Sequence, residues 1–173
     1  IVGGGGAPLA AMALGQGDRL RAGKILGNGF VLLILFTLFT SFIAYTFMEP
    51  ILLFTGASEN TLEYAVDYLS IYLLGTVFVE ISTGLNSFIN AQGRPAIAMY
   101  SVLIGALLNI ILDPIFIFWF DMGVKGAALA TVLSQACSAA WVLSFLFSRR
   151  ASLPLEKRNM RLSRKIVFAM LAL

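Results

Sequence analysis

The stretch AIAMYSVLIGALLNIILDPIFIFWF, residues 96–120, is apolar over most of its length and carries a single charge, at Asp113. A helix that crosses a bilayer needs ~20 mostly apolar residues, so this run is long enough to span one. A charged side chain in the bilayer core costs at least ~2.5 kcal/mol on insertion scales, and it persists where it faces protein or water. The stretch therefore predicts a transmembrane helix that carries a buried functional group.

The composition of the whole chain also favours a membrane protein. The 173 residues are 59% hydrophobic and 12% charged, and the mean hydropathy is +0.89. Soluble domains carry about 25% charged residues, roughly twice this share. The net charge of +3 comes from basic residues in the gaps between apolar runs, with no interleaved aromatic residues. This distribution is a topology signal, and no nucleic-acid partner is expected.

Four charge-poor runs predict four complete transmembrane helices, and two shorter runs predict partial ones. The complete runs are residues 30–48, 68–89, 96–120 and 126–148. Residues 1–14 and 166–173 are apolar but shorter, and we expect them to be the end of an earlier helix and the start of a later one. The predicted fold class is an all-α integral membrane protein, a polytopic helix bundle, and the chain is expected to be a fragment of a larger protein.

Basic and acidic residues alternate between the segments that join these runs. Segments 15–27 and 149–165 carry Arg and Lys and segment 90–95 carries Arg94, whereas segment 49–67 carries acids and no base. Segment 121–125 holds one charge of each sign. Cytoplasmic loops are enriched in Lys and Arg, so the three basic segments are predicted to be cytoplasmic. The longest of them, 149–165, is predicted to be a solvated linker between two groups of helices.

Polar residues inside the runs define a candidate cation site. Residues four apart share a helix face, which places Asp113, Asn109, Gly105 and Ser101 on one small and polar stripe. Thr131 in the next run lies at a similar depth, because it is ~8 Å and Asp113 ~10 Å from the outer helix ends at 1.5 Å per residue. Asp113, Asn109 and Thr131 are therefore predicted to form one hydrogen-bonded cluster that responds to H⁺ or Na⁺. Asp113 and Asn109 are the candidate Na⁺ ligands.

Pro114, Glu80 and Gln135 complete the set of candidate residues. Pro114 has no backbone N–H, so it is predicted to kink the helix and to free the carbonyl of Ile110 as an acceptor. Glu80 lies on a polar helical face and is predicted to bind a cationic compound or take a proton in the substrate cavity. Gln135 is predicted to line the same cavity. For each polar side chain the alternative is a contact that only holds the helices together.

Several kinds of chemistry are excluded within these 173 residues. The chain contains no histidine and one cysteine, Cys137, and it has no GxSxG, Walker-type or GxGxxG pattern. Serine–histidine catalysis, an internal disulfide and the usual His and Cys metal clusters therefore need residues that this sequence lacks. We do not expect an enzyme, and no cofactor is expected apart from the coupling ion. Cys137 and Trp141 are predicted to be packing residues.

The segment FINAQGRPAIAMYSVLIGALLNIILDPIFIFWFDMGVKGAALATVLSQ, residues 88–135, resembles the multidrug and toxic compound extrusion (MATE) family. The motifs that carry the resemblance are AQGRP at 91–95, NxxxDP at 109–114 and GxxGAALATxxSQ at 123–135. The resemblance extends over essentially the whole chain and implies twelve helices in two six-helix lobes. It implies that residues 1–148 are the N-terminal lobe from the end of helix 2 to helix 6. Residues 149–165 would then be the cytoplasmic inter-lobe linker, and 166–173 the start of helix 7.

The resemblance also implies a function and a set of site residues. The family's amino-terminal-lobe cation site includes residues that match Asn109, Asp113 and Thr131. The implied activity is that of a secondary active antiporter in the inner (plasma) membrane of a bacterium, which exports amphipathic or cationic compounds in exchange for H⁺ or Na⁺. Its partners would be drugs or toxic organic cations and membrane lipids, and the full-length protein is expected to be a monomer.

Other functions stay open at this point. One is a flippase for lipid-linked glycans from the same superfamily, for which a strongly basic cavity would be expected. Another is a membrane scaffold that transports nothing. An intramembrane enzyme is a third, and it is disfavoured because the sequence lacks histidine and paired acids.

Overall fold

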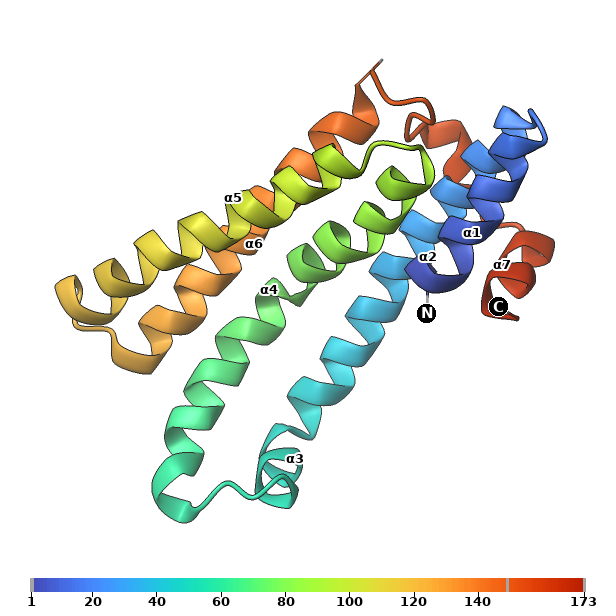
Figure 1. The fold of residues 1–173 in the computed structure, drawn as a ribbon. Helices are drawn as coiled ribbons and strands as arrows, with labels where there is room; N and C mark the ends of the chain where they lie inside the picture. The colour runs from blue at the N-terminus through green and yellow to red at the C-terminus, as the bar shows by residue number, and fades with distance from the viewer. Residues whose placement is uncertain (1, 149, 173) are drawn as a thin grey trace.

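The computed structural model describes residues 2–148 and 150–172, apart from the side chain of Glu59. Ile1, Arg149 and Leu173 lie outside the described residues, as do the parts of the predicted segments that fall on them. Within the described ranges the secondary structure is helical, without strands, which confirms the predicted all-α class (Figure 1). The elements are α1 (Val2–Gly15), α2 (Arg19–Thr46), α3 (Met48–Phe54), α4 (Glu59–Ala91), α5 (Pro95–Pro114), the π-helix η1 (Ile115–Trp119), α6 (Gly123–Phe147), the 3-10 helix η2 (Lys157–Met160) and α7 (Arg164–Leu171).

Four helices are long and apolar enough to cross a membrane, in agreement with the four predicted spans. They are α2, α4, α5 continued by η1, and α6. Their ends differ from the predicted ones, because segments 15–27 and 49–67 are largely helical rather than loops. Asp18 caps α2 inside the basic segment by accepting a hydrogen bond of 2.9 Å from the backbone N–H of Arg21. The side chain of Thr61 accepts one of 3.0 Å from the backbone N–H of Ser58, which fixes the start of α4.

The long helices lie side by side in the order α2, α4, α6 and α5, which differs from their order in the chain. Figure 1 shows α5 and α6 as a pair, with α4 between this pair and α2, and α1 and α7 near the far side of α2. Small residues allow the close approaches. A Cβ added at Gly75 of α4 would lie 2.3 Å from a methyl group of Val132 on α6, and one at Gly105 of α5 would lie 2.5 Å from the hydroxyl of Ser138 on α6.

The chain changes from α-helix to π-helix directly after Pro114, whereas the predicted kink at this residue stays a prediction. The helix α5 ends at Pro114, and the chain continues directly into η1, where the backbone N–H of Phe120 donates to the carbonyl of Ile115 at 3.0 Å. This wider turn packs on the start of α6, since a Cβ at Gly126 would lie 2.7 Å from the carbonyl oxygen of Phe116. Short π-helical turns within α-helices are frequent at functional sites, and this one directly follows Asp113.

The segment after α6 is docked on the bundle rather than solvated throughout. Asn28 on α2 is fully buried, and its Nδ2 donates to the carbonyl oxygens of Asn159 (3.3 Å) and Arg161 (3.1 Å). Its Oδ1 accepts from the backbone N–H of Ser163 at 2.7 Å. Because a buried amide needs partners, these bonds bind the segment and the helix to each other.

A second set of contacts holds the earlier part of the same segment. Gln92, directly after α4, accepts a hydrogen bond of 2.9 Å through Oε1 from the backbone N–H of Leu153. The side chains of Leu153 and Leu155 are buried. The backbone approaches α2 so closely that a Cβ at Gly27 would lie 2.3 Å from the carbonyl oxygen of Asn159. The described basic side chains of the segment are exposed, namely those of Arg150, Lys157, Arg158, Arg161, Arg164 and Lys165. Its backbone is nevertheless held by these contacts.

Candidate cation site and substrate cavity

Asp113 and Asn109, the first two predicted site residues, are in contact. They lie one turn apart on α5, and Asn109 Nδ2 donates to Asp113 Oδ1 at 3.1 Å. Both side chains are partly buried. The carboxylate belongs to the membrane-spanning segment Pro95–Trp119, in which Asp113 is the only charged residue. Residues four apart on a helix face the same way, so the local sequence is sufficient to build this pair.

Thr131 shares a cavity with Asn109 but not with Asp113, which is not among the lining residues of that cavity. Its hydroxyl donates to the carbonyl of Ala127 in its own helix at 3.0 Å. Thr131 and Asn109 line the same cavity of about 220 Å³ between α4, α5 and α6. The single hydroxyl hydrogen is used by the backbone, so toward the cavity Thr131 offers its oxygen as an acceptor. The structure therefore brings Thr131 to the site as a lining residue.

This cavity, which we call the polar cavity, collects hydroxyl and amide groups from three helices. Its lining includes Ser82 and Asn86 from α4, Ser101 and Asn109 from α5, and Thr131, Ser134, Gln135 and Ser138 from α6. A polar space of this size has room for several water molecules at about 30 Å³ each. It is therefore suited to small hydrated species rather than to a drug-sized compound.

Asn86 also lines the polar cavity, although it was not predicted from the sequence. Its Nδ2 donates to Ser101 Oγ at 2.7 Å. Its Oδ1 is buried and has no partner in the part of the chain that the structure describes. A buried acceptor of this kind costs free energy unless water or a cation satisfies it. The spacing of Ser82 and Asn86, four residues apart, was the available signal in the sequence.

Glu80 and Gln135 were predicted to line the same cavity, but in the structure each lines a different one. Glu80 lines a larger space of about 460 Å³ between α1, α2 and α4, together with Thr37, Thr40 and Thr83. Gln135 lines the polar cavity instead, and its Oε1 accepts from Ser82 Oγ at 3.0 Å. Thr83 borders both spaces, so the two cavities adjoin at α4. We call the larger one the Glu80 cavity.

The Glu80 cavity is lined by one acidic residue, and the polar cavity by no charged residue. Their lining residues include Glu80 and no Lys or Arg. Within residues 2–148 and 150–172, no three or more His, Cys, Asp and Glu side chains gather as a metal cluster would require. A Na⁺ ion at Asp113 and Asn109 would rely on carboxylate and amide oxygens, which suit hard cations. If the Asn109 side-chain amide rotates by half a turn, its oxygen takes the position from which Nδ2 now donates. The Asn109 amide and the Asp113 carboxylate can then both offer oxygen to the ion.

Four membrane-spanning helices, an acid within one of the spans and a polar cavity between three of them define a polytopic membrane protein. The MatE family profile matches residues 1–115, and the chain belongs to this family. It is 34% identical over 150 residues to the multidrug export protein MepA of Staphylococcus haemolyticus (strain JCSC1435). The aligned region covers 87% of this chain and 33% of the relative. The chain thus spans about a third of the length of this curated relative.

Solved structures show the same fold. One is an inward-facing conformation of a multidrug resistance MATE family transporter of the MOP superfamily, with a TM-score of 0.93 and 26% identity over 99% of this chain and 39% of that one. The other is an outward-facing conformation of such a transporter, with a TM-score of 0.90 and 26% identity over 98% and 38%. These matches confirm the resemblance found in the sequence and identify a multi-pass protein of the bacterial plasma membrane. The relatives are named as transporters, not enzymes.

Proposed function

We propose that the full-length protein is a secondary active multidrug antiporter that exports amphipathic or cationic compounds in exchange for H⁺ or Na⁺. Asp113 is its ion-responsive group, Asn109 is the partner that orients the carboxylate, and Thr131 is an acceptor at the same depth. The observation that carries the proposal is the hydrogen-bonded Asp113–Asn109 pair inside a membrane span, with Asn109 lining the polar cavity. Such intramembrane acids mark ion and proton pathways in transporters.

The Glu80 cavity supplies the proposed substrate side. Its volume of about 460 Å³ falls in the range of small-molecule sites, about 300–1,000 Å³. Glu80 gives it a negative charge, and Leu33 and Phe36 give it an apolar wall. An amphipathic cation has the matching chemistry. The names of the staphylococcal relatives as multidrug export proteins point to the same class of compound.

The alternative functions are less well supported. A flippase for lipid-linked glycans would bind phosphates and would need basic side chains in its cavity, whereas both cavities here lack Lys and Arg among their lining residues. A scaffold that transports nothing gives no reason for an acid in a membrane span, where its presence is costly. Flux measured in proteoliposomes distinguishes a scaffold from either transporter.

The decisive experiment replaces Asp113 in the full-length protein. Asp113→Asn keeps the shape of the side chain and removes its charge. We expect this variant to insert and to bind drug, but to lose drug efflux driven by an imposed H⁺ or Na⁺ gradient in proteoliposomes. Asp113→Glu keeps the carboxylate and should retain part of the activity.

Asp121→Asn is the matched control, because Asp121 is an exposed acid in the turn before α6. This variant should transport at the wild-type rate. If Asp113→Asn also transports at that rate under both gradients, Asp113 is structural, and the coupling lies outside these residues.

A further inference from the structure

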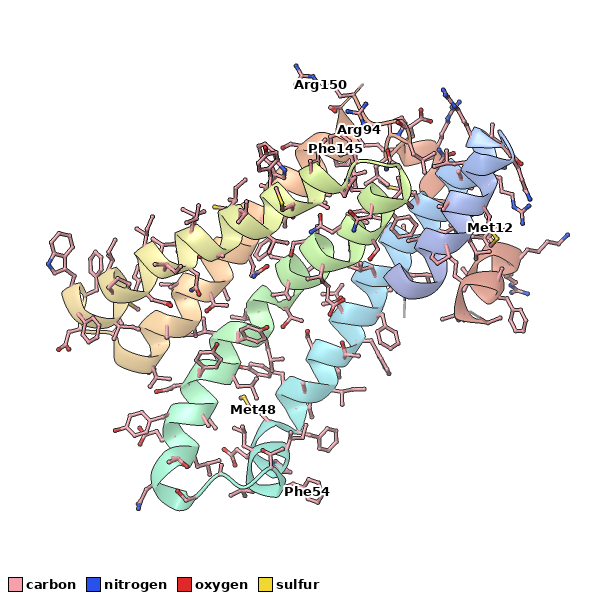
Figure 2. All side chains as sticks on the ribbon, viewed as in Figure 1. Met12, Met48, Phe54, Arg94, Phe145 and Arg150 are labelled. Atoms are coloured by element: carbon pink, nitrogen blue, oxygen red, sulfur yellow. The ribbon has the colours of Figure 1, made fainter. Side chains whose placement is uncertain are left out.

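The end of the bundle opposite η1 carries a cavity that the proposed transport cycle does not use. It has a volume of about 380 Å³ and is lined by Arg94, Ile97, Trp141, Ser144, Phe145, Ser148 and Arg150. Figure 2 shows Arg94, Phe145 and Arg150 at the same end of the α5–α6 pair. We call this space the arginine pocket. It combines two cations, two hydroxyl groups and aromatic side chains in one place.

The two arginines have no acid to neutralise them. In the part of the chain that the structure describes, the salt bridges are Lys125–Asp67 and Arg158–Glu156, and neither involves Arg94 or Arg150. The guanidinium Cζ of Arg94 lies 6.0 Å from the ring centroid of Phe145, which holds the cation over the pocket. Guanidinium groups present planar donor pairs that match the oxygens of a phosphate.

The aromatic wall of the pocket is fixed in position. Trp141 Nε1 donates to the backbone carbonyl of Ile97 at 3.2 Å. The ring of Tyr100 meets that of Trp141 edge to face, with centroids 6.4 Å apart. Trp141 lies six residues before the end of α6 at Phe147, or ~9 Å at 1.5 Å per residue. Trp and Tyr are enriched at this depth, where the lipid headgroups meet the acyl chains.

An exposed apolar stripe continues from this wall along α5. Tyr100, Leu107 and Ile111 follow one another at spacings of seven and four residues, which places them on one side of the helix. Their side chains are 50%, 60% and 55% exposed. Val102 and Ala106, which line the polar cavity, lie on a different side of α5. The stripe thus leads from the two arginines into the membrane, away from the proposed transport route.

We propose that the arginine pocket binds one anionic phospholipid. The phosphate lies between Arg94 and Arg150, the hydroxyl groups of Ser144 and Ser148 contact the headgroup, and an acyl chain lies along Tyr100, Leu107 and Ile111. The positive charge without acidic partners selects an anionic headgroup over a zwitterionic one, and the apolar stripe selects a lipid over free phosphate.

The test uses the purified full-length protein in detergent and native mass spectrometry. Phosphatidylglycerol, phosphatidylcholine with the same acyl chains, and inorganic phosphate are titrated separately. The double variant Arg94→Gln/Arg150→Gln removes both charge-assisted contacts to the phosphate, and we expect it to bind phosphatidylglycerol at least about tenfold more weakly. The control Lys157→Gln/Arg164→Gln removes the same charge from exposed residues outside the pocket and should change the affinity less than twofold.

A fluorescence measurement needs no arginine variant. Brominated phosphatidylglycerol should quench the emission of Trp141, obtained as the difference between the wild type and Trp141→Phe, more strongly than brominated phosphatidylcholine does. Equal quenching by the two lipids overturns the proposal. So does a double variant that keeps wild-type affinity for phosphatidylglycerol, or inorganic phosphate that binds as tightly as the lipid.

Discussion

Asn109 and Asp113 are joined across one turn of α5 by a hydrogen bond of 3.1 Å between Nδ2 and Oδ1. When the Asn109 amide is turned, it offers its oxygen to Na⁺ beside the Asp113 carboxylate, and amide oxygens suit hard cations. We expect Asn109→Ala to weaken the apparent affinity for Na⁺ about tenfold, since 1.4 kcal/mol corresponds to a factor of ten. The measurement is drug efflux from proteoliposomes as a function of Na⁺ concentration.

The control for this prediction is Asn90→Ala, because Asn90 is exposed near the end of α4 and lines neither cavity. It should leave the concentration dependence unchanged. An unchanged dependence in Asn109→Ala would show that the amide only supports the helix.

The charge of Glu80 should govern discrimination among drugs. Glu80 lines the Glu80 cavity with its side chain exposed, so a cation bound there would be attracted to it. We expect Glu80→Gln to weaken binding of cationic drugs by more than binding of neutral drugs of similar size, as measured by equilibrium titration. Glu63→Gln, an exposed acid near the start of α4, is the control. A uniform loss for all drugs, or none, would remove Glu80 from recognition.

The bonds of Asn28 should hold segment 149–165 on the bundle. Asn28→Ala leaves the backbone N–H of Ser163 and the carbonyls of Asn159 and Arg161 without this partner. Each buried group left unsatisfied costs about 1–3 kcal/mol. We expect a lower melting temperature and faster trypsin cleavage after Arg158 and Arg161. A variant that resists trypsin as the wild type does would show that the docking does not depend on Asn28.

Gly75 and Val132 provide a test of helix packing. Gly75→Ala places a methyl group where Val132 already lies, at 2.3 Å from the nearest atom. Overpacking of this kind typically costs about 1–3 kcal/mol. We expect Gly75→Ala to lower the thermal stability and Val132→Ala to restore part of it in the double variant. Gly4→Ala is the control, since nothing lies within 4 Å of its added Cβ. If the double variant melts at the sum of the two single losses, α4 and α6 are not in contact there.

The charge alternation predicts which ends of the helices face the cytoplasm. With the exposed Cys137 replaced by alanine, single cysteines at Thr55 and Asp121 should react with an impermeant thiol reagent added to intact cells. A cysteine at Lys157, in the basic segment, should react only after the membrane is permeabilised. The physical reason is the excess of Lys and Arg in cytoplasmic segments. Equal labelling of all three in intact cells would contradict this orientation.

The membrane spans were predictable because their signal is local. Hydrophobic length alone defines a span, and the four predicted runs correspond to α2, α4, α5 with η1, and α6. Their ends were predicted poorly, because a helix that begins in water continues past the apolar run to the nearest cap. Asp18 and Ser58 are such caps, and both lie in segments predicted as loops.

The candidate site was predictable in part for the same reason. The contact of Asn109 with Asp113 follows from a spacing of four. The bond predicted for Thr131 had a local competitor, since threonine in a helix can donate to the carbonyl four residues earlier, and here it donates to Ala127. The docking of Asn28 joins residues 131 to 135 positions apart. No periodicity in the sequence reports such a contact.

A flexible segment as long as residues 149–165 would have an r.m.s. end-to-end distance of roughly 20–25 Å and many conformations. The docked segment has lost that freedom, and α7 is held as well, since Met170 is buried and its carbonyl oxygen would lie 2.1 Å from a Cβ at Gly5. The position and direction of α7 are therefore set by the first bundle of helices. Any helices that follow would begin at a fixed position and in a fixed direction relative to this bundle. If those helices moved as a separate unit, the bundle and α7 would move together as one rigid body, and the hinge would lie at or beyond the end of α7.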